Sequence, residues 1–350
     1  MKLDDKPVSP RSGRRAPMFA AAMFAIVACA WPTSAATLMV GPDQKYKAPS
    51  EAARYAQPGD TIEIAAGTYF DCVVWQTDNL TIVGTGSGTV LTDKTCQGKA
   101  IFVTVGKDIT IRNLTFARAR VPDFNGAGIR AEGVNLRVEH SRFINNQSGI
   151  LAASVPDSTI NILDSQFIEN GQCYSNHCTG ALTIGSIASL NIRHCFFWGT
   201  KGGDHILSRA RRTELTDSRI ADGSAGTAAY LVDLPEGGSL IMRGNQLEKG
   251  PNSGHPDIAV KVMAGFGAQP VNNLVFELNH LRVDTNGKLV FVSNWSGLGA
   301  QMSGNSFQGA VVPISSAGYV WFASKSFMRY SLDSAKALAK AFAHQIKSFL

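Results

Sequence analysis

The chain has 350 residues, of which 44% are hydrophobic and 17% charged, and its formal net charge is +6. An apolar fraction of this size supplies a sizeable core, so wholesale disorder is excluded. The 34 glycines, about one residue in ten, indicate many turns and are not typical of a helical bundle.

Residues 1–36 are predicted to be an export signal peptide. A basic stretch that ends at Arg15 precedes the apolar run of residues 16–30. This run is shorter than the roughly 20 apolar residues that span a bilayer, so no transmembrane segment is expected in the mature chain. Small residues before Thr37 favour cleavage there, which predicts a periplasmic or secreted protein.

Two other routes of export stay open. The segment 26–29 resembles a bacterial lipobox, in which Cys29 would carry a lipid anchor in the outer envelope. The pair Arg14-Arg15 weakly resembles a twin-arginine signal. Cleavage before Thr37 would remove five basic and two acidic residues and lower the formal net charge from +6 to +3. No concentrated basic stripe remains, so nucleic acid is not an expected partner.

The next element is a short helix predicted over residues 48–56, with Ser50 as its N-cap. It lies just before the first repeat, where it would cap an open end of the fold.

An irregular repeat follows, and it is the strongest feature of the sequence. Segments such as 135–143, 159–167 and 189–197 alternate apolar and polar residues and end in Phe. The closing apolar residue recurs about every 27 positions, at Phe116, Phe143, Phe167, Phe197, Ile220, Leu247, Leu281 and Phe307. Short alternating segments that end in turn residues are typical of strands, and stacked coils of such strands bury one continuous face. Residues 37–322 are therefore predicted to form an all-β parallel β-helix of about eight to ten coils.

Polar residues at the turns of this repeat are expected to be structural. Asn145, Asn146, Asn245, Asn279 and Asn305 are predicted to form ladders in the left-handed conformation.

Five cysteines would remain in the mature chain. Cys72–Cys96 and Cys173–Cys178 are plausible disulfides in an exported protein, which leaves Cys195 over. A zinc site that joins Cys173, Cys178 and Cys195 to His177 and His194 is the alternative, but its spacing is not a standard one.

The last element, residues 323–350, is predicted to be an amphipathic helical tail. Its apolar residues recur near helical spacing and lysines lie opposite. It would cover the solenoid, or alternatively lie on a membrane surface.

The chain resembles exported right-handed parallel β-helix proteins of the pectate-lyase-like superfamily, most of all a largely uncharacterised bacterial branch. The resemblance is carried by segments 49–53, 59–69, 125–130, 146–151, 204–210 and 233–238. It implies a right-handed solenoid and an acidic polysaccharide of uronate type as substrate. The superfamily includes lyases, hydrolases, epimerases and binding proteins, so the fold does not decide the reaction.

β-Elimination on a uronate needs a cation for the carboxylate, a base for the C5 proton and an acid for the leaving oxygen. Strand alternation is expected to point His205 and Tyr230 outward, with Arg209 on the same side. His205 is predicted to be the general base, Arg209 the carboxylate clamp and Tyr230 the acid. Asp204 or Asp233 would orient the histidine. The alternative is an exposed histidine in a turn, with Arg209 paired to a carboxylate.

Three further residues are predicted to bind substrate. Arg130 lies three coils before His205, and Tyr174 and His177 lie in an insert over 170–178. No metal or other cofactor is predicted, because the acidic residues Asp204, Asp217 and Asp222 are too scattered to support calcium.

The sequence thus predicts an exported, monomeric β-helix lyase or C5-epimerase of an acidic polysaccharide. The alternative is a non-catalytic carbohydrate-binding or envelope assembly protein.

Overall fold

The structure is a computed structural model that describes residues 1, 35–175, 177–263, 269–285 and 287–316. The described residues from Ala35 onward belong to one compact unit. Most of the predicted signal peptide, including Cys29, and the predicted helical tail over 323–350 lie outside the described residues. No helix in the described ranges is long and apolar enough to cross a bilayer.

The helix at the start of this unit is α1 (Pro49–Ala53), which lies within the predicted range of 48–56 and is shorter than it. Ser50 is not its N-cap, because Ala48 holds that position in an extended conformation. Proline is favoured at the first helical position, where its missing N–H has no partner to lose. The backbone N–H of Ser50 instead donates to Asp71 Oδ2, 2.8 Å away.

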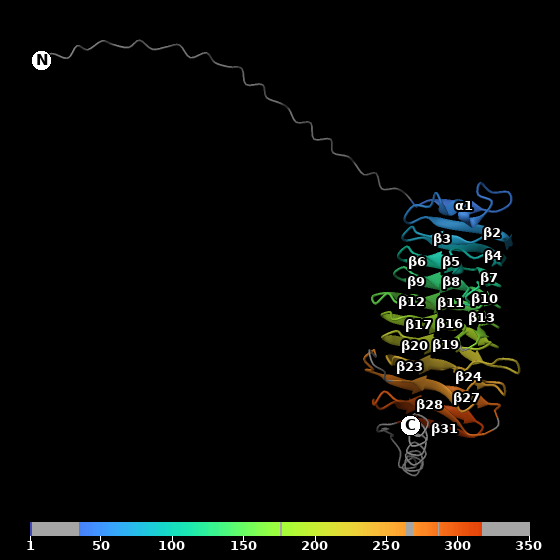
Figure 1. The fold of residues 1–350 in the computed structure, drawn as a ribbon, viewed down its shortest axis with the longest axis vertical. Helices are drawn as coiled ribbons and strands as arrows, with labels where there is room; N and C mark the ends of the chain where they lie inside the picture. The colour runs from blue at the N-terminus through green and yellow to red at the C-terminus, as the bar shows by residue number, and fades with distance from the viewer. Residues whose placement is uncertain (2–34, 176, 264–268, 286, 317–350) are drawn as a thin grey trace. The chain divides into compact units, whose positions relative to one another are not determined.

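Three parallel strips of strands make up the solenoid, and Figure 1 shows its coils stacked in chain order from α1 to β31. The first strip runs through β1 (Thr37–Val40), β2 (Thr61–Tyr69), β4 (Thr81–Thr92), β6 (Ile109–Arg112), β9 (Leu136–Glu139), β12 (Thr159–Leu163), β17 (Ser189–Arg193), β20 (Arg212–Thr216), β23 (Ser239–Arg243), β26 (Leu274–Glu277) and β29 (Gln301–Ser303). The second strip continues from β4 through β7 (Thr115–Ala117), β10 (Arg142–Ile144), β13 (Gln166–Ile168), β18 (Phe196–Trp198), β21 (Arg219–Ala221), β24 (Gln246–Lys249), β27 (His280–Val283) and β30 (Ser306–Gln308).

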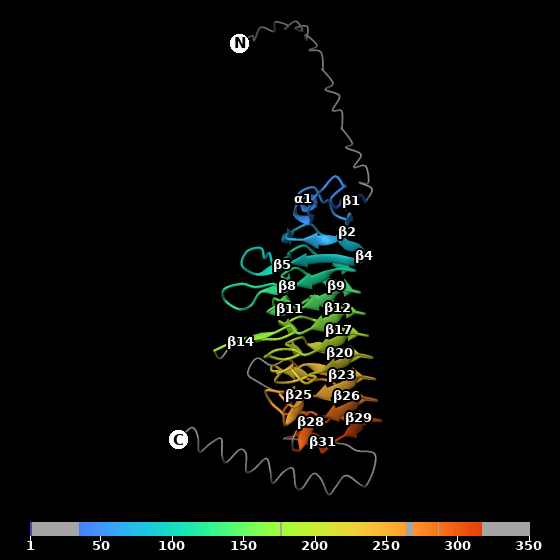
Figure 2. The same cartoon turned by 90° about the vertical axis from the view of Figure 1, so that its right-hand side faces the viewer.

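The third strip is a separate ten-stranded sheet. It comprises β3 (Val73–Trp75), β5 (Ala100–Thr104), β8 (Ala127–Ala131), β11 (Ser148–Ala152), β16 (Leu182–Ile184), β19 (Ile206–Ser208), β22 (Val232–Leu234), β25 (Ile258–Val262), β28 (Leu289–Asn294) and β31 (Val311–Ser316). Several of the loops that enter these strands are long, among them residues 118–126, residues 222–231 and the segment between β13 and β16. One of them forms the antiparallel hairpin of β14 (Gln172–Tyr174) and β15 (His177–Thr179), which stands away from the stack in Figure 2.

The strand register confirms the repeat predicted from the sequence. All eight closing residues pair in sequence along the second strip, from Phe116 to Phe307. The rings of Phe143 and Phe167 lie 4.7 Å apart and nearly parallel inside the solenoid. Residue 149 lies against this stack and is a glycine, because a Cβ at this position would lie only 2.7 Å from Phe167 Cδ1.

Both predicted disulfides are present, Cys72–Cys96 and Cys173–Cys178, and Cys195 is a buried free thiol. Since Cys173 and Cys178 are bonded to each other, the alternative in which they bind zinc is wrong.

Candidate active site

A cluster of ionisable residues lies at the edge of the ten-stranded sheet where the long loops enter β19, β22 and β25. Asp204 and Tyr230 end two of these loops, and Asp233 lies in β22. Asp233 pairs in register with Leu207 of β19 and with Lys261 of β25. Side chains at one register position of a parallel sheet share a face, so Asp233 and Lys261 lie on the same face of the sheet, on neighbouring coils.

Asp204 is the most perturbed carboxyl of this cluster. Only 7% of its surface is exposed, and its Oδ1 accepts a hydrogen bond from the backbone N–H of Tyr230 at 3.0 Å. Burial, together with the negative charge of Asp233, raises the pKa of Asp204 to about 7. The positive charges of Lys249 and Lys261 lower this pKa and so oppose part of the rise. At neutral pH the Asp204 carboxyl therefore holds a proton for about half of the time.

Asp233 has an oxygen that is left without a partner. Its Oδ1 is buried and makes no hydrogen bond to any described residue, while its Oδ2 lies 3.9 Å from Lys261 Nζ. Burial raises the pKa of Asp233, and the charges of Lys261, Arg209 and His255 oppose the rise. A buried unpaired oxygen is costly to a folded protein, which points to a role in binding or catalysis.

Tyr230 lies next to this carboxyl pair. Its ring stacks on the exposed His255 with centroids 5.0 Å apart, and Lys261 Nζ lies 4.9 Å from its centroid. Burial and the neighbouring carboxylates raise the pKa of the Tyr230 phenol to about 12. The phenol therefore stays protonated at neutral pH and is available as a hydrogen-bond donor.

Arg209 follows β19 and is already engaged. Its Nε lies 2.9 Å from Glu236 Oε1, and both side chains are about one third exposed. This pairing matches the alternative considered for Arg209, although its charge still acts on Asp233.

The prediction that His205 lies on the outer face is wrong. His205 is fully buried, with Nδ1 2.8 Å from Thr200 Oγ1 and Nε2 2.9 Å from Asp222 Oδ1. The residue precedes β19, so the alternation of strand side chains does not extend to it and both it and Ile206 are buried. Neither Asp204 nor Asp233 hydrogen-bonds to it; Asp222 does.

A buried charge network continues from this histidine. Asp222 Oδ2 accepts the N–H of Gly250 at 2.9 Å and lies 4.0 Å from Lys249 Nζ. Lys249 is fully buried and donates to the backbone oxygen of Ala229 at 2.5 Å. Burial lowers the pKa of Lys249 to about 8, against the charges of Asp222 and Asp204, while His205 and Lys249 help to hold the pKa of Asp222 down.

The remaining predicted residues lie farther along the solenoid. Arg130 is three strands before Leu207 at the same register position, and its Nε lies 3.2 Å from Glu132 Oε1. Tyr174 and His177 pair across the β14–β15 hairpin and are both exposed.

Four members of the cluster were missed at the level of sequence: Asp222, Lys249, His255 and Lys261. Lys261 could have been found, because it lies one coil after Asp233 in the same register. In the described ranges no group of three or more His, Cys, Asp or Glu side chains could hold a metal ion.

Comparisons with known proteins agree on the fold. A family model described as a right handed beta helix region matches residues 67–220. No curated protein matches the chain. The tailspike protein of Acinetobacter phage vB_ApiP_P1 superposes with a TM-score of 0.56 at 11% identity, over 77% of this chain and 51% of the tailspike. The chain thus spans about half of the tailspike's length.

Two enzymes of known structure are also similar. Pectate lyase Pel9A gives a TM-score of 0.49 at 12% identity, with 84% of each chain covered. The alginate lyase from Paenibacillus sp. str. FPU-7 gives 0.45 at 17% identity, with 79% of this chain and 99% of the lyase covered. The likeness to the tailspike, at 11% identity, shows the fold alone. The family model, the tailspike and the parallel strand register together confirm the predicted right-handed parallel β-helix.

Proposed function

Because the chain is a right-handed parallel β-helix protein, we propose that it acts on a polysaccharide with uronate units, with Asp204 and Asp233 as an acid–base pair. The observation that carries this proposal is the pair itself. Two buried carboxyls lie on adjacent coils, both with raised pKa, and one has an unpaired oxygen. Perturbed carboxyls of this kind concentrate at active sites.

The environment assigns a different role to each carboxyl. With a pKa of about 7, Asp204 retains a proton near neutrality and would donate it to the leaving glycosidic oxygen. The charges of Lys261 and Arg209 favour the ionised form of Asp233, which would remove the C5 proton. Tyr230 would donate a hydrogen bond from its neutral phenol.

Uronate as the substrate class is supported by the cations beside the pair and by the resemblance to the pectate-lyase-like superfamily. Lys261 and Arg209 are each partly exposed, so the ammonium of Lys261 or the guanidinium of Arg209 could neutralise a substrate carboxylate. Neutralisation of the substrate carboxylate lowers the pKa of the C5 proton. Elimination and C5 epimerisation both require removal of this proton.

A non-catalytic carbohydrate-binding protein is the second candidate. It is favoured by Tyr174, which is 60% exposed on the projecting hairpin. We also propose that the chain is exported, either with cleavage before Thr37 or with a lipid anchor at Cys29. The exported protein is proposed to be a monomer. The two disulfides support an oxidising compartment.

The variant Asp233→Asn tests the proposed reaction. It keeps the shape of the side chain but removes the base, so turnover of polygalacturonate or alginate is expected to fall by about 100-fold or more. Asp157→Asn is the matched control, because Asp157 is 95% exposed on the same solenoid and lies outside the cluster. Activity is followed both by the ultraviolet absorbance of an unsaturated uronate product and by new reducing ends.

Each outcome of this assay has a distinct meaning. Absorbance that appears with reducing ends indicates elimination, and reducing ends alone indicate hydrolysis by the same carboxyl pair. Solvent deuterium that enters the polymer without cleavage indicates epimerisation. Full activity in Asp233→Asn would sink the assignment of this site, and polymer binding without any turnover would favour the binding protein.

A further inference from the structure

Two loops from different coils meet outside the core through a pair of stacked rings. Phe124, in the loop that enters β8, and Tyr174, on the β14–β15 hairpin, have ring centroids 4.2 Å apart and planes inclined by 5°. Neither ring is part of the hydrophobic core cluster. Tyr174 remains 60% exposed, so the stack presents a flat aromatic surface to solvent.

Both loops are held rigidly in place. The buried amide of Gln147 accepts hydrogen bonds from the N–H groups of Val121 and Gly126, each at 2.8 Å, and so fixes both ends of the Phe124 loop. Phe124 itself holds a left-handed backbone conformation with φ of 65°. Such a conformation is unfavourable for a bulky residue and tends to persist where function requires it.

The hairpin is fixed by two other contacts. The Cys173–Cys178 disulfide closes it, and the Thr179 hydroxyl donates to the backbone oxygen of the same Gln147. The two loops therefore present their rings in a preorganised arrangement, which lowers the entropy lost when a ligand binds. His177 pairs directly with Tyr174 across the hairpin and adds a polar, exposed side chain next to the rings.

The hairpin also lies against the candidate active site. A Cβ on Gly202 would lie 2.3 Å from Cys173 Sγ, and Asp204 follows Gly202 two residues later in the same loop. The N–H of Lys201 in this loop donates to Asn170, just before the hairpin, at 2.8 Å. A polymer that follows the solenoid axis would therefore reach the rings and the carboxyl pair together.

We infer that Phe124, Tyr174 and His177 form a saccharide-binding subsite for a pyranose unit of the polymer, on the N-terminal side of the carboxyl pair. The C–H face of a pyranose packs on an aromatic ring, and its hydroxyls are left to polar neighbours such as His177. This inference rests on the proposed polysaccharide function for the identity of the ligand. It does not depend on which reaction the carboxyls perform.

Binding to polygalacturonate and to alginate tests the subsite, measured by the retardation of the protein in gels that contain each polymer. The Asp233→Asn background prevents degradation of the polymer. Tyr174→Ala in this background is expected to weaken binding by about tenfold, the effect of one lost ring stack. Tyr174→Phe keeps the stack and should bind nearly as well as the parent.

Tyr55→Ala is the matched control, because Tyr55 is 63% exposed and also pairs with a second ring, that of Tyr46. The subsite is overturned if Tyr174→Ala binds as tightly as Tyr55→Ala with an unchanged melting temperature, or if the parent binds neither polymer. If Asp233→Asn retains full turnover, the proposed catalytic site fails, and the subsite then stands if Tyr174→Ala alone raises the KM for the polymer by about tenfold. If Asp233→Asn loses turnover while Tyr174→Ala binds as tightly as the parent, the proposed catalytic site stands and the subsite fails.

Discussion

The ionisation of Asp204 should make the stability of the protein depend on pH. The pKa of Asp204 is raised in the folded state to about 7, above its usual value of 3.8. Its protonated form favours folding, so its contribution is complete below about pH 4 and is lost as the pH rises through about 7. The loss amounts to about 1 kcal/mol for each pH unit in this window.

Asp204→Asn removes this titration while its amide oxygen can still accept the N–H of Tyr230. Urea unfolding between about pH 4 and pH 7 should therefore show the stability of the wild type falling relative to that of the variant. The exposed Asp157→Asn serves again as the control and should follow the wild type. Parallel curves for the wild type and Asp204→Asn would contradict the raised pKa.

Single residues of the site were predictable from the sequence only in part. Asp204, Tyr230 and Asp233 were found because they flank short apolar segments at matching places in successive coils. His205 was misplaced because a loop residue next to a strand does not follow the strand's alternation. Lys249 was missed because a lysine is almost never fully buried unless it is paired, and its partner Asp222 lies 27 residues away in the chain.

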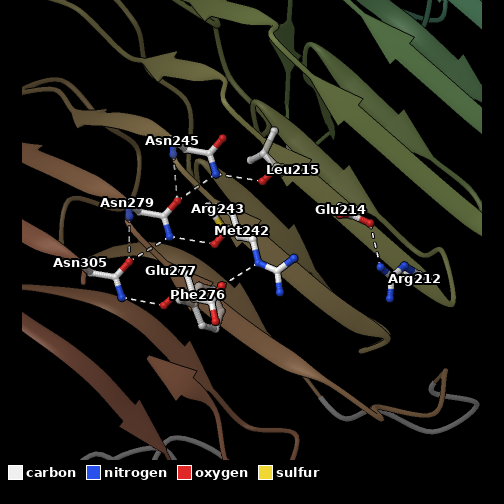
Figure 3. Close-up of polar contacts among 10 residues, drawn as sticks. All are labelled: Arg212, Glu214, Leu215, Met242, Arg243, Asn245, Phe276, Glu277, Asn279 and Asn305. Atoms are coloured by element: carbon white, nitrogen blue, oxygen red, sulfur yellow. Dashed lines mark hydrogen bonds and ion pairs between the residues drawn. The ribbon is translucent and has the colours of Figure 1, made fainter. Parts of the chain in front are cut away.

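At the scale of the turn elements, asparagine amides link successive coils from within. Figure 3 shows Asn245, Asn279 and Asn305 in one line, each donating through Nδ2 to a backbone oxygen, that of Leu215, Met242 and Phe276 respectively. Asn279 Oδ1 also accepts the Nδ2 of Asn245 at 2.9 Å. The ladder was predicted correctly, but the predicted left-handed conformation is wrong for four of the five residues, because Asn145 alone among them has a positive φ.

Loss of one rung should destabilise the solenoid strongly. Asn279 is 1% exposed, and its replacement by Ala removes the acceptor for the N–H and the Nδ2 of Asn245 and the donor to the oxygen of Met242, all of them buried. The expected loss in the free energy of unfolding is about 3 kcal/mol, since each unsatisfied group costs about 1–3 kcal/mol. Urea denaturation measures it.

Asn252→Ala provides the comparison for the ladder, because Asn252 is exposed and its amide donates to the oxygen of Ser224 at 2.8 Å. Its replacement should change the stability by less than about 1 kcal/mol. The exposed pair Arg243–Glu277, also drawn in Figure 3, is expected to contribute similarly little. Equal losses in Asn279→Ala and Asn252→Ala would show that burial of the ladder is not what stabilises the turns.

The whole molecule was the most predictable level. Each coil contacts chiefly its neighbours, so the same positions recur with the same requirements and a phenylalanine such as Phe167 falls between Phe143 and Phe197. The loops carry no such repeat, and they hold Asp204 and Tyr230 of the candidate active site and Phe124 of the proposed subsite. Fold and site therefore differ in predictability, because the strands are constrained by stacking and the loops by contacts that are specific to each coil.

One of the two disulfides adds to this stacking near the N-terminal end of the described solenoid. Cys72 precedes β3 and Cys96 precedes β5, two adjacent strands of the ten-stranded sheet, and the bond closes a separation of 24 residues. Cys173–Cys178 closes a separation of only 5 residues within one hairpin. If the bonds act by restricting the unfolded chain, their contributions are about 3 and about 2 kcal/mol respectively.

Paired alanine variants separate the two bonds. Cys72→Ala with Cys96→Ala should lower the free energy of unfolding by about 3 kcal/mol, and Cys173→Ala with Cys178→Ala by about 2 kcal/mol or less. The hairpin projects from the stack, so its opening leaves the coils in contact, whereas the first bond ties two coils together. Urea unfolding of both variants and of the oxidised parent gives the comparison. A larger loss from the hairpin pair than from Cys72 and Cys96 would mean that the hairpin is part of the folding unit and not an appendage on it.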